Sequence, residues 1–227
     1  RPHFVTLYFE EPDLTAHQAG PDSPAVAEAV ARVDAALGRL LDGIDRLPHR
    51  DQVYVVLVSD HGLGQVGDEV FVLDQAVDLE GVDVVGGGEV AFLHVREGGE
   101  RRIEALAQEI REAWPSGAVY RRGEAPTSWW IEDNPRFGDL ILLADYPSRI
   151  VFSDWVGRPV NPGSHGWGPE VPEMHGIFLA MGPGLPAGSR IGRMSPVDVY
   201  PLLAKALGLE PAEGVQGDPD RLGGLIR

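Results

Sequence analysis

The sequence has no cysteine and one lysine, Lys205, among its 227 residues. Without cysteine there are no disulfides, thiolate zinc sites or cysteine nucleophiles, so a transition metal must bind histidine and carboxylate side chains. Lys205 lies in a helical pattern, which excludes the glycine-rich phosphate loop that ends in lysine. Long apolar runs are also missing, since 53–58 and 140–144 fall short of the roughly 20 residues that span a membrane. We expect no membrane span.

Basic residues are scarce, with 19 Lys and Arg against 35 Asp and Glu and a formal charge of −16. This excess repels phosphate backbones, so we expect no nucleic-acid polymer as a partner, although carboxylates can still hold divalent ions. The first residues, RPHFVTLYFEEPD, show no signal-peptide pattern and suggest a chain that starts inside a longer protein. We expect a soluble protein, cytoplasmic or exported with its signal peptide lost, and the oligomeric state is left open.

The N-terminal third has the pattern of a βαβ unit. Residues 3–9 are β-branched and aromatic and predict a buried strand. An apolar stripe predicts a helix over 24–47, with Ser23 as its N-cap. Residues 53–60 are almost continuously apolar up to Asp60, as expected for a central parallel strand. Ligand sites in open α/β sheets lie beyond the carboxyl ends of such strands.

The remaining pattern predicts that one domain over 1–227 contains a smaller α+β subdomain, or an elaborated edge, at 80–150. Within that subdomain we expect a strand, EVAFLHV, and a helix from about 100 to 113. A strand at 177–182 and a helix at 196–207 follow, the helix capped by Ser195.

Two motifs near the predicted strand ends combine carboxylate and imidazole groups. Asp13 and His17 are four positions apart, so on a helix they share a face and can bind one ion. The alternative is an N-cap aspartate followed by an exposed histidine. Asp60 and His61 precede Gly62, which lets the backbone leave the strand so that both side chains converge. Their alternative is a polar strand cap.

A third motif, GSHGW at 163–167, places His165 between small residues that allow its loop to approach another segment. His175 is a competing ligand, but it opens an apolar strand and is better explained by packing or by contact with a ligand residue. Trp167 could stack on a nucleobase, against the alternative of core packing. Two carboxylates and three histidines suit zinc, since magnesium and calcium prefer more oxygen ligands; other divalent transition metals also fit.

Four segments resemble the type I phosphodiesterase/nucleotide pyrophosphatase family of the alkaline phosphatase superfamily. They are YFEEPDLTAHQAGPDS at 8–23, VSDHGL at 58–63, GSHGW at 163–167 and MHGIFLAMGP at 174–183, and RFGDLILLA at 136–144 looks like the segment before the last histidine. The resemblance implies an α/β fold, a three-layer α/β/α sandwich with a mostly parallel central sheet and a small α+β elaboration. It also implies that 1–227 is a single, partial catalytic domain of a phosphoric ester hydrolase that acts on small phosphodiesters or nucleotides.

The resemblance also implies two zinc ions. Asp13, His17 and His165 look like the ligands of one zinc, and Asp60 and His61 look like two ligands of the other. The family's nucleophilic threonine and a further aspartate ligand lie on a portion before the YFEEPD segment and have no counterpart here. Rival functions are a phosphonate hydrolase, phosphomonoesterase or sulfatase on the same scaffold, or a non-catalytic metal-binding module.

Overall fold

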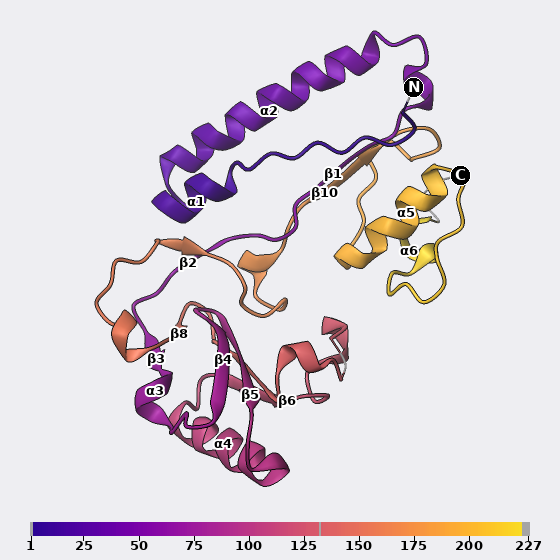
Figure 1. Cartoon of the computed structure of the whole chain (residues 1–227). Coiled ribbons are helices and arrows are strands. Elements are labelled where there is room, and N and C mark those ends of the chain that lie inside the picture. The colour runs from indigo at the N-terminus through magenta and orange to yellow at the C-terminus, as the bar shows by residue number, and fades with distance from the viewer. Residues whose placement is uncertain (1, 132, 224–227) are drawn as a thin grey trace. The chain divides into compact units, whose positions relative to one another are not determined.

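The computed structural model describes residues 2–131 and 133–223, which form two compact units (Figure 1). Unit 1 contains Arg1–Glu11, Ala29–His61 and Gly176–Arg227, and unit 2 contains Pro12–Glu28 and Gly62–His175. Each unit is described by itself. The helix α2, Pro24–Asp45, begins in unit 2 and continues into unit 1.

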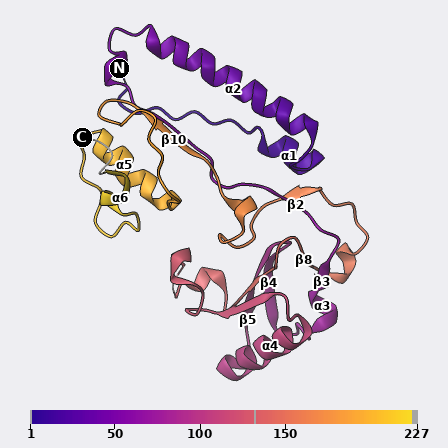
Figure 2. The ribbon, with the colours of Figure 1, turned by 180° about the vertical axis from the view of Figure 1, so that it is seen from behind.

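The α2 helix and a two-stranded ribbon confirm three predicted elements. The hydroxyl of Ser23 accepts a hydrogen bond from the N–H of Ala25, as expected of an N-cap. In unit 1, β1 (Val55–Val58) pairs with β10 (Phe178–Met181), and the two run side by side in Figures 1 and 2. The pairing is antiparallel, whereas the sequence pattern of residues 53–60 predicted a strand with parallel neighbours. A short 3-10 helix, η1 (Arg50–Gln52), precedes β1.

The predicted strand at 3–9 is wrong for the described residues. This segment is extended, but it pairs with no strand in the part of the chain that the structure describes. Its apolar side chains are exposed, among them Val5 at 66% and Tyr8 at 85%. The β-branched composition favours an extended backbone, but a strand also needs a neighbour for its N–H and C=O groups.

Unit 1 ends in a helical segment that Asp198 holds together. The 3-10 helix η6 (Pro196–Asp198) leads into α5 (Val199–Ala206), and α6 (Pro219–Gly223) follows. The carboxylate of Asp198 is 1% exposed and accepts hydrogen bonds from the backbone N–H groups of Ser195 and Asp218. It also accepts a hydrogen bond from Arg221 at 3.0 Å. One carboxylate therefore joins α6 to the start of the predicted 196–207 helix, and Ser195 is confirmed as its cap.

We expect Asp198→Ala to lower the free energy of unfolding of unit 1 by about 3 kcal/mol, because two backbone N–H groups and Arg221 lose a charged acceptor. Urea unfolding followed by circular dichroism measures the change, since all five tryptophans lie in the residue ranges of unit 2. Glu210→Ala, at an exposed position, is the control. A loss no larger than that of the control would contradict the anchoring role.

Unit 2 is built on a four-stranded antiparallel sheet in the order β4-β5-β7-β6. Its strands are β4 (Val82–Gly87), β5 (Val90–Val95), β6 (Ala118–Arg121) and β7 (Leu140–Leu143). The helix α4 (Gly99–Ala113) packs on this sheet through Ile103, Leu106, Ala107 and Ile110, which join Leu140 and Leu142 in the core (Figure 1). The predicted helix at about 100–113 and the EVAFLHV strand are confirmed. The predicted 80–150 subdomain boundary stays a prediction.

The other elements of unit 2 are short. They are α1 (Asp13–Ala19), β2 (Gly64–Gln65), β3 (Val70–Val72), α3 (Leu73–Ala76), η2 (Thr127–Trp129), η3 (Pro135–Phe137), β8 (Arg149–Val151), η4 (Ser153–Trp155), β9 (Gly163–Ser164) and η5 (Pro172–Met174). Only β3 and β8 pair in parallel among the described residues, so the expected mostly parallel sheet is not seen there.

The Asp74 carboxyl joins two of these short elements. Hydrogen bonds from Ser153 lower its pKa and connect η4 to α3.

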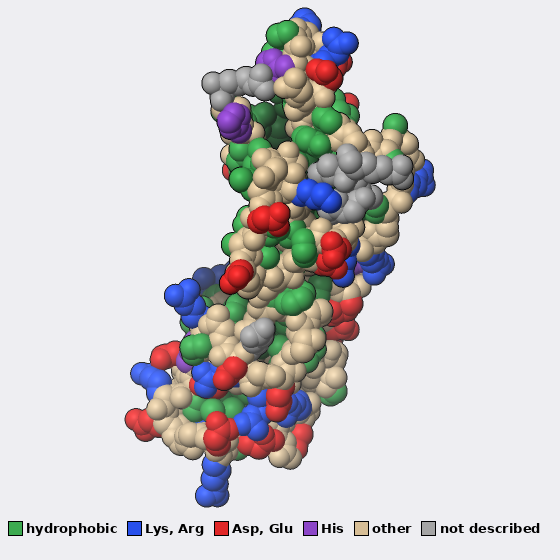
Figure 3. Space-filling view, turned by 90° about the vertical axis from the view of Figure 1, so that its right-hand side faces the viewer, with side chains coloured by type: hydrophobic (Ala, Val, Ile, Leu, Met, Phe, Trp, Pro, Cys, Tyr) green, Lys and Arg blue, Asp and Glu red, His purple; other side chains and the backbone are tan. Residues whose placement is uncertain are grey.

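The surface near α4 carries charges of both signs. Figure 3 shows acidic and basic side chains interleaved over the lower part of the view. Arg121 forms ion pairs with Glu100 and Glu104 of α4. Its positive charge is therefore balanced by its neighbours.

Among the described residues, no helix combines the length and the apolar character that a membrane span requires.

Candidate metal centre

The first two predicted ligands lie on one face of a short helix. Pro12 stands at the N-cap position of α1, and Asp13 opens the helix. The four-residue spacing therefore places Asp13 and His17 one turn apart, with His17 Nε2 3.5 Å from Asp13 Oδ1. The helical form assumed for this motif is confirmed, and the alternative of an exposed histidine does not apply, because the His17 side chain is 24% exposed.

The third predicted ligand comes from the segment that β9 brings against α1. A Cβ added to Gly163 would lie 2.3 Å from the carbonyl oxygen of Ala16, so only glycine permits this approach. His17 Nδ1 donates a hydrogen bond to the carbonyl oxygen of Gly163 at 2.8 Å. A carbonyl oxygen has no proton to give, so Nδ1 carries the proton and the Nε2 lone pair of the neutral ring is left for a ligand.

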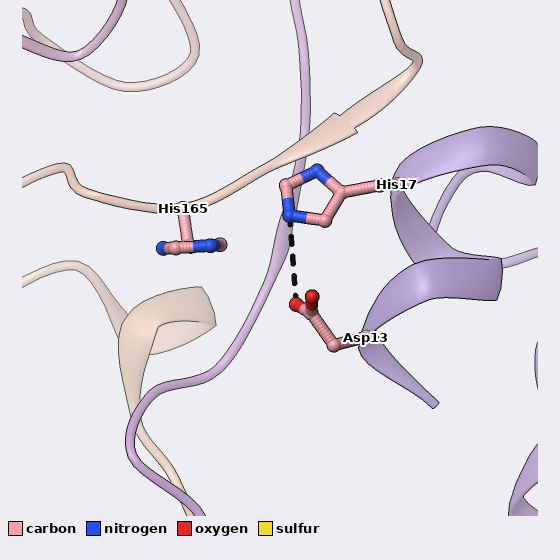
Figure 4. A group of neighbouring side chains, drawn as sticks. All are labelled: Asp13, His17 and His165. Carbon is pink, nitrogen blue, oxygen red and sulfur yellow. Dashed lines mark ion pairs between the residues drawn. The ribbon is translucent and has the colours of Figure 1, made fainter. Parts of the chain in front are cut away.

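The three side chains converge on one point. Asp13, His17 and His165 each offer a ligand atom, and these atoms lie within 4.8 Å of one another. The rings of His17 and His165 lie edge to face with centroids 5.1 Å apart. Figure 4 shows Asp13 and His17 projecting from one side of α1 toward the segment that carries His165. All three residues are half-buried.

Two observations show that this donor set fits a metal ion. Asp13 Oδ1 is buried and has no hydrogen-bond partner in the structure, a costly state unless a cation compensates it. His17 has the arrangement typical of a zinc ligand, in which the second ring nitrogen donates to a backbone carbonyl and orients the ring. Two imidazoles and one carboxylate are borderline donors of the kind zinc takes, with a further position open in such sites.

The second predicted pair lies at the end of β1 in unit 1. The Asp60 side chain is 81% exposed, and its Oδ2 lies 3.6 Å from His61 Nε2. Another Asp60 oxygen accepts a hydrogen bond from the N–H of His61. The two side chains therefore do turn toward each other after the strand, as the motif predicted, and their role as metal ligands stays a prediction.

The glycine after this pair has a different role from the predicted one. In unit 2 the N–H of Gly62 donates to the carbonyl oxygen of Met174, and a Cβ on Gly62 would lie 2.1 Å from the carbonyl oxygen of Glu173. Gly62 is therefore required by a close backbone approach. From the sequence alone, a glycine directly after a charged pair looks the same whether it permits a turn or a close backbone approach.

The two remaining candidates of the sequence are not members of the described metal-ligand cluster. His175 Nε2 donates to the carbonyl oxygen of Pro169 at 3.0 Å, which agrees with a packing role. Trp167 is 4% exposed and belongs to the core of unit 2. Its predicted contact with a nucleobase stays a prediction. Sequence reasoning missed the Gly163 carbonyl as the partner of His17, because a backbone acceptor leaves no trace in the residue type.

Comparisons with known proteins identify the family and support the fold. The family model for type I phosphodiesterase/nucleotide pyrophosphatase matches residues 1–168, which include all the predicted ligands. Human ectonucleotide pyrophosphatase/phosphodiesterase family member 7 is 33% identical over 91% of this chain and 46% of its own length. The mouse protein of the same name is 31% identical over 98% of this chain and 51% of its own length.

Solved structures show the same relationship. Murine ectonucleotide pyrophosphatase/phosphodiesterase 5 superposes with a TM-score of 0.85 at 31% identity, covering 97% of this chain and 58% of that one. The human protein of this name gives a TM-score of 0.85 at 27% identity. The α/β, alkaline-phosphatase-like fold is thereby confirmed. The chain belongs to the type I phosphodiesterase/nucleotide pyrophosphatase family, whose members are phosphoric ester hydrolases, and it spans about half the length of the curated relatives it matches.

Proposed function

We propose that this chain forms part of a zinc-dependent hydrolase that cleaves phosphodiester or pyrophosphate bonds in small nucleotides. The observation that carries the proposal is the convergence of Asp13, His17 and His165, whose ligand atoms lie within 4.8 Å of one another. A shared cation would compensate the buried Asp13 oxygen, which has no hydrogen-bond partner in the structure. Membership of the family supports the reaction class.

The proposed site has two zinc ions. Asp13, His17 and His165 are the proposed ligands of one, and Asp60 and His61 are two proposed ligands of the other. We propose that the nucleophile, a threonine or serine, and one further aspartate ligand come from sequence before Arg1. The greater length of the relatives supports this division, since family member 7 is matched over only about half its length.

The side chains of this chain have defined tasks in such a site. A pair of zinc ions supplies positive charge that activates a nucleophile and stabilises the leaving oxygen in phosphoryl transfer. Asp13 contributes one anionic oxygen to that site. His17 contributes its Nε2 lone pair, held in direction by the Nδ1 bond to Gly163. His165 closes the cluster from the opposite segment.

Nucleotides are the substrates that the comparisons support best. An inactive variant of murine ectonucleotide pyrophosphatase/phosphodiesterase 5 was solved in complex with AMP. Another relative, human bis(5'-adenosyl)-triphosphatase, is 29% identical over 92% of this chain. We propose the same chemical class, a nucleoside phosphodiester or pyrophosphate, for the protein that contains this chain.

The test is a substrate comparison with the full-length gene product. We expect kcat/KM to be highest for a nucleotide pyrophosphate or a phosphodiester, lower for a phosphomonoester, a phosphonate and a sulfate ester, and to fall to background after chelation of zinc. Zinc should restore the activity. A preference for the monoester, phosphonate or sulfate ester would favour a rival hydrolase. Zinc binding without turnover of any of them would favour a non-catalytic module.

A further inference from the structure

The segment that carries His165 is attached to one turn of unit 2 from both sides. After His165, the indole of Trp167 is buried and its Nε1–H donates to the carbonyl oxygen of Ser148 at 2.9 Å. The same indole packs edge to face on Tyr146, with ring centroids 5.0 Å apart and an interplanar angle of 89°. Trp167 therefore ties the end of the motif to residues 146–148.

The residue before His165 reaches the same turn through the β2–β9 ladder. Ser164 pairs with Gly64 of β2. A Cβ on Gly64 would lie 2.5 Å from the ring of Tyr146, so this ring packs directly on the strand that pairs with Ser164. Tyr146 thus contacts β2 on one side and Trp167 on the other, and His165 lies between the two attachments.

The turn itself is fixed. Ser148 is 5% exposed, and both its N–H and its hydroxyl donate to the carbonyl oxygen of Asp145. Its own carbonyl accepts the Trp167 N–H in a buried position. Removing that donor would leave a buried acceptor without its partner, which is costly. The hydrogen bond therefore attaches the Trp167 indole to this turn, and an apolar side chain of similar size lacks the N–H that makes it.

We propose that Trp167 is a positioning residue for His165, with Tyr146 and Ser148 as its anchor. A histidine followed by Gly166, whose φ is +116°, has a backbone with little intrinsic restraint. Fixing the residues on both sides lowers the conformational entropy that His165 loses when it binds an ion. This inference rests on the proposed zinc site, and it gives Trp167 a task other than contact with a nucleobase, for which a 4% exposed ring has little free surface.

The test is the zinc affinity of the folded chain, measured by competition with a chromogenic chelator. We expect Trp167→Phe to weaken zinc binding about 10-fold or more, because the loss of groups that orient a metal ligand has effects of this size. The matched control is Trp129→Phe, which removes an indole that packs on Tyr120 in the same unit. This control should keep the affinity of the wild type.

Two further measurements separate the explanations. If Trp167 has a purely structural role, Trp167→Phe lowers the thermal midpoint of the metal-free protein. The zinc affinity, measured at a temperature well below that midpoint, then stays that of the wild type. This result would overturn the inference. His165→Ala is the reference variant. If it also binds zinc as tightly as the wild type, the proposed zinc site is wrong. If it loses zinc while Trp167→Phe does not, only the positioning role is wrong.

Discussion

Replacing His17 by alanine is expected to strip zinc from the cluster and to lower phosphodiester hydrolysis by the full-length protein more than about 100-fold. The variant removes the Nε2 donor and the hydrogen bond to Gly163 together. It leaves Asp13 Oδ1 and His165 as two donors, too few for a stable zinc site. Elemental analysis of zinc per chain and kcat/KM on one phosphodiester measure both effects.

The control for this variant is His49→Ala. His49 precedes η1 in unit 1 and is not a member of the described metal-ligand cluster. It should keep the zinc content and activity of the wild type. Full zinc content in His17→Ala would show that His17 is not a ligand, and low activity with full zinc would place its role in the reaction instead of in metal binding.

Gly163→Ala is expected to weaken zinc binding about 10- to 100-fold without removing a ligand. The added Cβ would lie 2.3 Å from the Ala16 carbonyl oxygen. Neither atom can move aside by a side-chain rotation, because the Cβ is fixed to the backbone and the oxygen belongs to it. The segment must shift from α1, which breaks the bond between Gly163 O and His17 Nδ1. The His17 ring then loses its fixed orientation and proton position. Chelator competition measures the affinity.

The matched control here is Gly192→Ala, because a Cβ at Gly192 meets nothing within 4 Å and its φ needs no glycine. It should bind zinc like the wild type. If Gly163→Ala also does so, the close approach of β9 to α1 does not set the metal site. A thermal scan of both variants without metal shows whether unit 2 itself is destabilised.

Local patterns predicted the elements well, because they depend on neighbouring residues in the sequence. The stripe over 24–47 and the cap at Ser23 define α2 closely, and the four-residue spacing placed Asp13 and His17 on one helix face. Strand pairing was harder to predict. The antiparallel partner of β1 lies far along the chain in β10, and no property of residues 53–60 specifies that partner or its direction.

The candidate site shows the same limit. The residue types at Asp13, His17 and His165 pointed to a metal, but their meeting depends on the contact between Gly163 and Ala16. The orientation of His17 depends on a backbone carbonyl, which any residue possesses. The extended segment at 3–9 was misjudged because composition predicts backbone conformation but does not supply a pairing partner.

The hydrogen bond from His17 to Gly163 joins positions 146 residues apart. An ion shared by α1 and the His165 segment would close a loop of similar length and act as a crosslink. A crosslink that closes a long loop reduces the entropy of the unfolded chain, as a disulfide does. In a sequence without cysteine, the proposed zinc would thus stabilise the folded form of unit 2 as a disulfide would. Loss of the zinc would then lower the free energy of unfolding as well as abolish activity.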